Sequence, residues 1–274
     1  MSRERRARFA ELHARDGIFV MPNPWDAGSA KLLAGCGAEA LATTSAGFAW
    51  TLGRLDGRVA RDELVAHVAQ VAAATPLPLN VDSERCFPDD PGGVAETVRL
   101  LGAAGAAGCS IEDWNPVEGS IEDVGLATER VAEAVQAARG FDPPMIVTGR
   151  CENHLHGVDD LDDTIARLVA YREAGADVVY APGLADIESI SRVVQEVGIP
   201  VNVLALPNGP SVSALGAAGV RRVSTGGALA RSAYGALLAG AAELRDDGTS
   251  AYSKAGAPAE ALRAAFERGY TSDP

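Results

Sequence analysis

The stretch Leu79-Asn80-Val81-Asp82-Ser83-Glu84 has apolar residues at its first and third positions, carries Asp82 and Glu84 toward its end, and follows two prolines, Pro76 and Pro78. Prolines placed in this way are typical of a loop that leads into a buried strand. Seven further runs of this kind occur along the chain, and Ala-rich stretches with helical periodicity lie between them. The eight runs span residues 18–22, 40–45, 79–84, 109–113, 145–150, 178–182, 201–205 and 222–226. Eight strands that alternate with helices predict an α/β fold, a parallel sheet closed into a (β/α)8 TIM barrel.

An open, doubly wound sheet is the alternative fold for the same alternation. Such a sheet usually carries a Gly-x-Gly-x-x-Gly turn after its first strand, whereas here the first run leads into Asn23-Pro24-Trp25-Asp26. We therefore favour the barrel and expect it to occupy residues 1–245. Residues 246–274 are expected to form a linker and a short helix around 258–268. Its apolar positions Leu262, Ala265 and Phe266 either pack on a neighbouring subunit or fray in solution.

The 274-residue chain carries 24 Lys and Arg against 37 Asp and Glu, a formal net charge of −13. Nucleic-acid binding requires a basic footprint, so this balance argues against a nucleic-acid partner. No apolar run approaches the ~20 residues of a membrane span, and the N-terminus lacks the apolar stretch of a signal peptide. We expect a soluble, cytoplasmic protein without a membrane partner.

Zinc and covalent lysine chemistry are both disfavoured by the sequence. The four cysteines contain no Cys-x-x-Cys pair, and the cluster Cys151-x-x-His154-x-His156 has no fourth ligand nearby. The two lysines, Lys31 and Lys254, lie outside all eight predicted strands, which excludes a Schiff-base lysine on this barrel.

The carboxyl ends of the strands are where a barrel of this kind builds its active site. Alternate residues of a strand share a face, so Asp82 and Glu84 should point the same way, and Glu112 should face inward on the next strand. Carboxylates brought this close repel one another unless a cation offsets them. An all-oxygen ligand set with room for water suits Mg²⁺, or Mn²⁺, so we expect Asp82, Glu84 and Glu112 to form a metal site.

Arg150 ends the fifth predicted strand and should face the same centre. Its planar guanidinium can grip a carboxylate or phosphate, so an arginine beside a divalent cation predicts a small anionic substrate. Taken singly, a strand-end Asp is usually a helix cap and an Arg usually pairs with a neighbour; their conjunction on consecutive strands favours a site. Gly226-Gly227 could cradle a phosphate or simply form a tight turn, and Trp25, Trp50 and Trp114 could wall the site or pack under loops.

Several of these segments together resemble one enzyme superfamily. They are Val20–Ala30 (Val-Met-Pro-Asn-Pro-Trp-Asp-Ala-Gly-Ser-Ala), Thr43-Thr44-Ser45-Ala46-Gly47, Asn80-Val81-Asp82-Ser83-Glu84, Ser110-Ile111-Glu112-Asp113 and Arg150. In this order, from about residue 19 to about 239, they resemble the isocitrate lyase/phosphoenolpyruvate mutase superfamily. The branch most similar is the one called carboxyvinyl-carboxyphosphonate phosphorylmutase-like.

The resemblance implies a (β/α)8 barrel, usually a homotetramer that exchanges its last helix between subunits. It also implies Mg²⁺ and a 2-oxo or 2-hydroxy carboxylate that reacts through an enolate-like intermediate. By position, Asp82 matches the principal metal ligand, Glu84 and Glu112 match acids that hold the metal through water, and Asp56 matches a further acid near it. Thr44, Ser45 and Ala46 match the cradle for the substrate carboxylate and oxo group, while Arg150 matches the arginine that binds substrate.

The departures from the family pattern fall in the loops. Isocitrate and methylisocitrate lyases carry a Cys-Gly-His gating loop after the fourth strand, where this chain has Asn115-Pro116-Val117-Glu118-Gly119-Ser120. Cys109 is at the start of that strand and hence at the wrong end. The phosphonopyruvate enzymes place a His after the sixth strand, where Tyr180-Ala181-Pro182 stands here. The Asn and Thr that bind a distal substrate carboxylate fall at Leu204 and Leu206.

These observations lead us to expect a Mg²⁺-dependent lyase that cleaves or forms a C–C bond of a small 2-oxo or 2-hydroxy carboxylate. Arg150, Asp56 and Tyr180 are the expected catalytic residues; Tyr180, His154 and Glu118 are the candidate general acids. A phosphonate mutase or hydrolase, or an oxaloacetate-type hydrolase, on the same metal site is one alternative. A non-catalytic barrel that binds carboxylates is the other.

Overall fold

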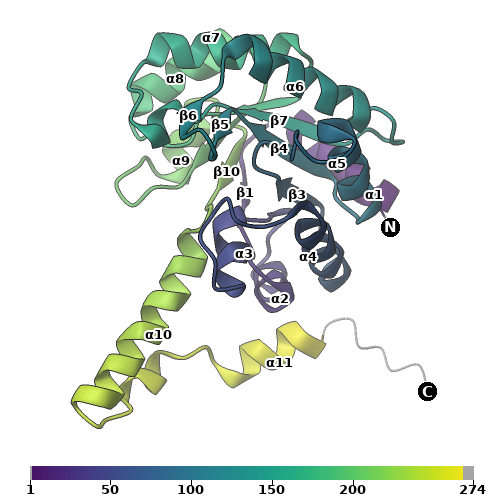
Figure 1. Cartoon of the computed structure of the whole chain (residues 1–274). Helices are drawn as coiled ribbons and strands as arrows, with labels where there is room; N and C mark the ends of the chain where they lie inside the picture. The colour runs from purple at the N-terminus through teal and green to yellow at the C-terminus, as the bar shows by residue number, and fades with distance from the viewer. Residues whose placement is uncertain (1, 268–274) are drawn as a thin grey trace.

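The computed structural model describes residues 2–267 of the chain and contains a strand at each of the eight predicted runs, within one residue of its limits. The strands are β1 (Phe19–Met21), β2 (Leu41–Ala42), β3 (Leu79–Asp82), β4 (Gly108–Glu112), β7 (Ile146–Arg150), β8 (Val178–Tyr180), β9 (Val201–Leu204) and β10 (Arg222–Ser224). All neighbouring pairs are parallel, in the order β1-β10-β9-β8-β7-β4-β3-β2. The predicted α/β barrel is therefore confirmed (Figure 1).

The two ends of this sheet, β1 and β2, approach each other and nearly close the barrel. The Ala42 amide donates to the Pro22 carbonyl at 3.2 Å, just beyond the end of β1. One residue further, the Asn23 Nδ2 donates to the Thr43 carbonyl at 2.7 Å. These bonds replace strand pairing at the seam and hold the loops after β1 and β2 side by side at the carboxyl end.

Helices surround the sheet and bury its outer face. They are α1 (Ser2–Ala14), α2 (Ala27–Gly35), α3 (Ser45–Thr51), α4 (Arg61–Ala74), α5 (Gly93–Ala103), α6 (Val124–Ala138), α7 (Leu161–Glu173), α8 (Ile187–Val197), α9 (Val212–Ala217), α10 (Ala228–Asp246) and α11 (Ala259–Glu267), with short 3-10 helices η1 (Asn153–His156) and η2 (Ala251–Ala255). Outward residues such as Val81, Val147 and Val179 are fully buried in the core between strands and helices. The neighbours of these residues on each strand therefore face the barrel interior.

The N-terminal helix α1 plugs the amino end of the barrel. Phe9 and Leu12 are buried in a second apolar cluster that includes Met21 of β1 and Ala107 just before β4. His13 of the same helix bonds to the guanidinium of Arg222, which lies inside the barrel, at 3.2 Å. The interior is thus sealed from below, and access is from the carboxyl end of the strands.

A small hairpin follows β4, in a segment where the sequence predicts only a loop. Its strands β5 (Trp114–Asn115) and β6 (Ser120–Ile121) pair in antiparallel fashion. The buried Glu122, directly after β6, binds Arg85 at 2.8 Å and also pairs with Arg130 of α6. These buried ion pairs fix the base of the hairpin beside the site.

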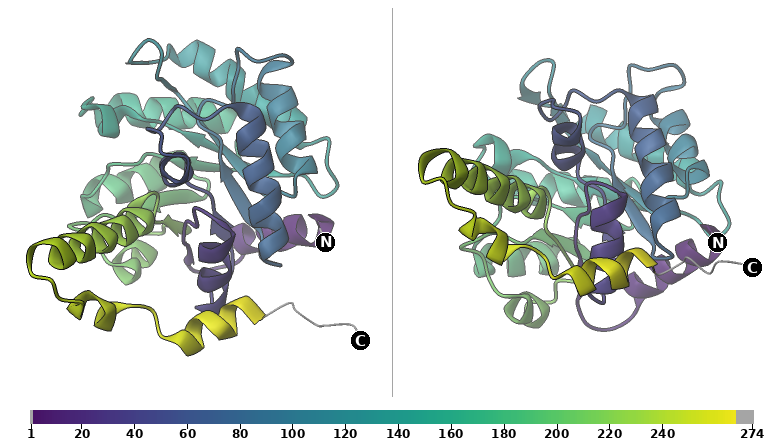
Figure 2. Two further views of the ribbon diagram at one scale, coloured as in Figure 1. Left: turned by 60° about the horizontal axis from the view of Figure 1, so that its bottom comes forward. Right: turned by 90° about the horizontal axis from the view of Figure 1, so that it is seen from below.

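The last helices form an arm that extends from the body of the barrel. Helix α10 projects outward, and the chain then returns through η2 to α11, as Figures 1 and 2 show. Helix α11 corresponds to the predicted C-terminal helix, of which residue 268 is outside the described residues. It contacts α2 of the same chain, where Ala265 is buried, so the apolar stripe has an intramolecular partner. Exchange of this helix between subunits stays a prediction.

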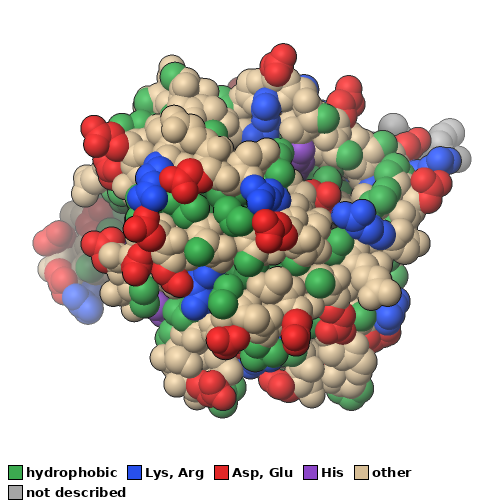
Figure 3. All heavy atoms as spheres, turned by 90° about the horizontal axis from the view of Figure 1, so that it is seen from above, with side chains coloured by type: hydrophobic (Ala, Val, Ile, Leu, Met, Phe, Trp, Pro, Cys, Tyr) green, Lys and Arg blue, Asp and Glu red, His purple; other side chains and the backbone are tan. Residues whose placement is uncertain are grey.

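Acidic and basic side chains are interspersed over the face drawn in Figure 3, with no continuous basic patch there. Within residues 2–267, no helix is long and apolar enough to cross a bilayer.

Candidate functional site

Two adjoining cavities open at the carboxyl ends of the strands. The first has a volume of about 180 Å³ and the second about 390 Å³. Ser45, Asp56, Arg150 and Leu155 line both cavities, so the two form one continuous site.

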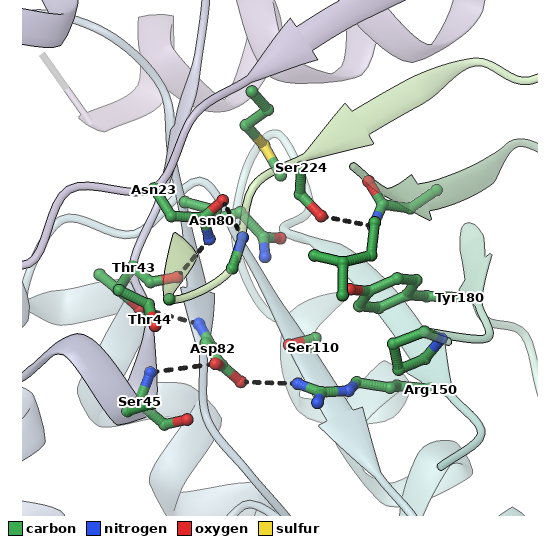
Figure 4. Close-up of a pocket in the computed structure, with 18 of the residues that line it drawn as sticks. Asn23, Thr43, Thr44, Ser45, Asn80, Asp82, Ser110, Arg150, Tyr180 and Ser224 are labelled. Atoms are coloured by element: carbon green, nitrogen blue, oxygen red, sulfur yellow. Dashed lines mark hydrogen bonds and ion pairs between the residues drawn. The ribbon is translucent and has the colours of Figure 1, made fainter. Parts of the chain in front are cut away.

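Asp82, at the end of β3, lies at the centre of this site (Figure 4). The Ser45 amide, at the start of α3, donates to its Oδ2 at 3.0 Å, and Arg150 approaches its Oδ1 at 3.2 Å. Thr44 caps α3 by accepting from the Gly47 amide at 3.2 Å. The positive end of a short helix therefore faces the carboxylate and the first cavity, which Thr44, Ser45 and Ala46 all line.

Arg150 ends β7 among three carboxylates. It pairs with Asp82 and Glu112, each at 3.2 Å, and its Nε donates to Glu152. Burial alone would lower the pKa of Arg150, but these acids raise it well above its usual value, so the side chain stays charged. Its Cζ also lies 5.4 Å from the ring centre of Tyr180, close enough for a cation–π contact.

Glu84 lines the second cavity and has an unusual backbone conformation. The strand β3 stops at Asp82, and Glu84 has a φ of 50°, in the left-handed region that non-glycine residues seldom adopt. Backbone strain of this kind clusters at functional sites. Burial and then repulsion from Asp82 and Asp56 raise the pKa of Glu84 to about 8.

Two further acids complete the cluster. Asp56, in the loop between α3 and α4, lines both cavities, and burial followed by repulsion from Asp82 raises its pKa. Burial also raises the pKa of Glu112 well above its usual value, although Arg150 opposes the shift. Burial and mutual repulsion thus raise the proton affinity of these carboxyl groups, and Arg150 offsets the effect only in part.

The donor set fits a hydrated Mg²⁺ better than a metal bound only by protein atoms. Among the described residues, no three Asp, Glu, His or Cys side chains converge as a ready ligand set. Mg²⁺, however, retains several waters and commonly uses only one or two carboxylates directly. The lack of three converging side chains is therefore compatible with a Mg²⁺ site in which one carboxylate would bind the metal directly and others would bind its waters.

Of the three candidate general acids, only one lines the site. Tyr180 lines the first cavity, whereas His154 and Glu118 line neither. His154 instead bonds to Thr164 at 3.2 Å, beneath the loop. Leu204 lines the first cavity and Leu206 lines neither.

The glycine pair and two of the tryptophans named above occupy different places around the site. Gly226 and Gly227 line the first cavity, and Trp114 lines the second. Trp50 instead packs beside Gly227 and Tyr234.

Two residues of the site were not assigned by the sequence analysis, Glu152 and His156. Both line the second cavity and follow Arg150 closely in the chain. Glu152 lies beyond the end of β7, as the cap of η1, so strand alternation could not have placed it in the site. His156 lies on η1, for which there was no periodic signal.

Known proteins are similar to this chain in sequence and in fold. The family model described as phosphoenolpyruvate phosphomutase matches residues 9–245. A crystal structure from Burkholderia cenocepacia J2315, provisionally described as a lyase or mutase, is 50% identical with a TM-score of 0.92 over 97% of both chains. An uncharacterised protein of Mycobacterium tuberculosis is 34% identical over 80% of this chain and 81% of its own length. A Corynebacterium glutamicum protein, named as a probable 2-methylisocitrate lyase, is 31% identical over 72% of this chain and 66% of its own.

Proposed function

The chain belongs to the phosphoenolpyruvate phosphomutase family, and on that premise we propose that it is a Mg²⁺-dependent lyase. Its reaction cleaves or forms a carbon–carbon bond of a small 2-oxo or 2-hydroxy carboxylate. The single observation that carries this proposal is the position of Asp82, which is held between the Ser45 amide and Arg150 inside a cluster of acids. Carboxylates this close together repel one another, and a bound cation would offset that repulsion.

Asp82 would bind Mg²⁺ directly, while Glu84 and Glu112 would bind its waters. When bound, the metal supplies Lewis-acid stabilisation of a negatively charged oxygen. Asp56, which lines both cavities and is close enough to Asp82 for that charge to raise its pKa, would orient a further water or a substrate hydroxyl. Mn²⁺ would satisfy the same oxygen donors.

The substrate carboxylate would rest on the backbone and hydroxyl groups of Thr44, Ser45 and Ala46. Arg150 would then contribute positive charge beside the enolate oxygen that develops during bond cleavage. Donors fixed in place before the reaction stabilise such charge with little reorganisation, which is commonly the largest catalytic contribution. The Tyr180 ring, packed against Arg150, would hold that guanidinium in position.

Calorimetric titration with Mg²⁺ and Mn²⁺ tests the metal site. Wild-type protein should bind, and Asp82→Ala should lose binding, whereas exposed Asp89→Ala on the surface should retain it. Unchanged binding by Asp82→Ala, or no binding by wild type, would overturn the proposal and favour a non-catalytic barrel.

A screen of 2-oxo and 2-hydroxy acids and phosphonopyruvate, read by NMR for bond cleavage, identifies the reaction. We expect turnover of a 2-hydroxy or 2-oxo carboxylate that Arg150→Ala lowers by about 10²-fold or more. Cleavage of phosphonopyruvate or hydrolysis of oxaloacetate in its place would assign the phosphonate or oxaloacetate reaction to the same metal site. Wild-type turnover by Arg150→Ala would contradict the assignment of this arginine.

We further propose that the chain forms a homo-oligomer, up to a tetramer, through the arm. Leu237 is 64% exposed and Leu238 71% exposed on α10, beyond the body of the barrel. Neighbouring large apolar side chains on a projecting helix are typical of a surface that a second copy covers.

A further inference from the structure

His156 occupies a wall of the second cavity beside two specific partners. Its Nε2 lies 3.6 Å from Glu152 Oε2. Its ring stacks on the indole of Trp114, with ring centres 3.4 Å apart and planes 10° from parallel. One partner comes from the start of η1 and the other from the hairpin after β4, so the imidazole is held from two sides.

This arrangement places a carboxylate beside one imidazole nitrogen, at an ion-pair distance that is longer than a hydrogen bond. Glu152 is buried and faces one ring nitrogen, while Nδ1 has no hydrogen-bond partner among residues 2–267. A carboxylate that fixes one nitrogen leaves the other available to exchange a proton with a bound molecule. The cavity that His156 lines also contains Glu84, Glu112 and Arg150.

Among the other titratable groups of the site, Glu84 and Glu112 are assigned above to the waters of the metal, and Tyr180, Glu152 and His154 are less suited to proton transfer near neutral pH. Burial raises the pKa of Tyr180 to about 12, so its phenol holds its proton firmly. Glu112 and Glu152 are bound to Arg150. His154, two residues before His156, bonds to Thr164 and lines neither cavity.

We propose that His156, oriented by Glu152 and Trp114, transfers the proton at the substrate carbon in the reaction proposed above. This inference rests on that proposed function. In the direction of enolisation, the neutral imidazole takes a proton from C3 of a 2-oxo carboxylate. The C–H bonding pair becomes the C2–C3 double bond, and the carbonyl pair becomes the negative charge on the 2-oxygen. In reverse, the imidazolium returns the proton to C3.

The surroundings of His156 keep its neutral form available. Burial first, and then the charge of Arg150, lower its pKa from the usual value of 6.5, while Asp113 acts in the opposite direction. The charged or titratable groups that line the same cavity are Asp56, Glu84, Glu112, Arg150 and Glu152. A base with a lowered pKa is neutral at pH 7, as proton abstraction requires.

The test is hydrogen–deuterium exchange at the methyl group of pyruvate, followed by proton NMR in D₂O with Mg²⁺. Pyruvate contains the reacting unit of any 2-oxo carboxylate, so the natural substrate need not be known. Wild-type protein should catalyse exchange, with a rate that falls at acidic pH as the imidazole becomes protonated. His156→Asn should lower the rate by about 10²-fold or more and lose this acid limb.

Matched variants distinguish a chemical role from a structural one. His154→Asn, on the same 3-10 helix, should exchange pyruvate within about two-fold of wild type, because its side chain is outside the cavities. Trp114→Leu should give an intermediate rate, because the ring would lose its stacking partner. Calorimetric binding of Mg²⁺ and of oxalate should be equal in His156→Asn and wild type, which establishes that the site is intact.

Undiminished exchange by His156→Asn would overturn the inference. So would a Tyr180→Phe variant that loses exchange while His156→Asn retains it. A wild-type protein that binds Mg²⁺ but catalyses no exchange would overturn it as well. The last result would leave the metal site standing. Failure of wild type to bind Mg²⁺ would instead overturn the proposed function and the inference together.

Discussion

Glu84 combines two unfavourable features at the scale of a single residue. Its backbone has a left-handed φ of 50°, and its carboxyl group is buried near Asp82 and Asp56. Both features place a negative oxygen where a hydrated cation would bind. The strain and the repulsion in the metal-free protein are therefore consistent with a site prepared for a ligand.

The pKa of Glu84 leads to a prediction about the metal-free protein. This pKa is 4.5 in an ordinary environment and about 8 in the folded protein. At pH values between these two, the folded state retains a proton that the unfolded chain has released. Stability should therefore fall as the pH rises from about 4.5 to 8. Glu84→Gln cannot ionise, so its Tm at pH 8 should exceed that of wild type by about 3 °C or more, with little difference at pH 5.

Thermal unfolding in the presence of EDTA measures this effect. Glu118→Gln, at an exposed position on the hairpin, is the matched control and should follow wild type at both pH values. Added Mg²⁺ should stabilise wild type more at pH 8 than at pH 5, because the metal replaces the proton. A Glu84→Gln protein that is less stable than wild type at pH 8 would contradict the electrostatic interpretation.

The residues that could be predicted were those on regular strands. Alternation along a strand brought Asp82, Glu112 and Arg150 to one centre, as the structure has them. Glu84 reached the site by a left-handed turn, to which strand alternation does not apply. His156 could not be foreseen, because its place depends on η1 and on stacking with a hairpin 42 residues earlier in the sequence.

At the scale of elements, the strands and most outer helices followed from hydrophobic periodicity, but the role of α1 did not. The helix is rich in Arg and Glu, and only its Phe9 and Leu12 are apolar and fully buried. Its polar residue His13 is satisfied by Arg222, 209 residues away in sequence. A contact between residues so far apart in the sequence produces no local sequence pattern. The position of α1 at the amino end of the barrel could therefore be recognised only from the structure.

Phe9 should therefore be essential for stability although it is far from the chemistry. Its ring is fully buried beneath the barrel and approaches Gly108 at the start of β4. Phe9→Ala should lower the free energy of unfolding by about 3–5 kcal/mol, measured by urea denaturation. Arg8→Ala, at the neighbouring exposed position, should change it by less than about 0.5 kcal/mol. Equal effects of the two substitutions would show that α1 does not seal the barrel.

At the scale of the whole molecule, the arm formed by α10, η2 and α11 is the least enclosed part of the described chain. Along α10 only Ala230 and Gly240 are buried, and Leu238 is among its most exposed apolar side chains. A helix of 19 residues with so little intramolecular cover gains stability if another copy packs against it.

Leu238→Lys should therefore disrupt assembly. We expect wild-type protein to sediment as an oligomer and the variant to shift toward the 28.2 kDa monomer, as measured by analytical ultracentrifugation. Arg231→Lys, on the same helix, preserves charge and should not change the sedimentation. A wild-type protein that sediments as a monomer at micromolar concentrations would contradict the proposed oligomer.

The stack of Trp114 on His156 also gives the molecule an internal optical probe. The chain contains three tryptophans, and this one alone is in face-to-face contact with an imidazole in the described structure. Indole emission is quenched by a protonated imidazole in contact with it. Any ligand that moves the hairpin away from η1, or changes the protonation of that histidine, would alter the intrinsic fluorescence. Events in the site could thus be followed in the native protein, without a dye and before its substrate is known.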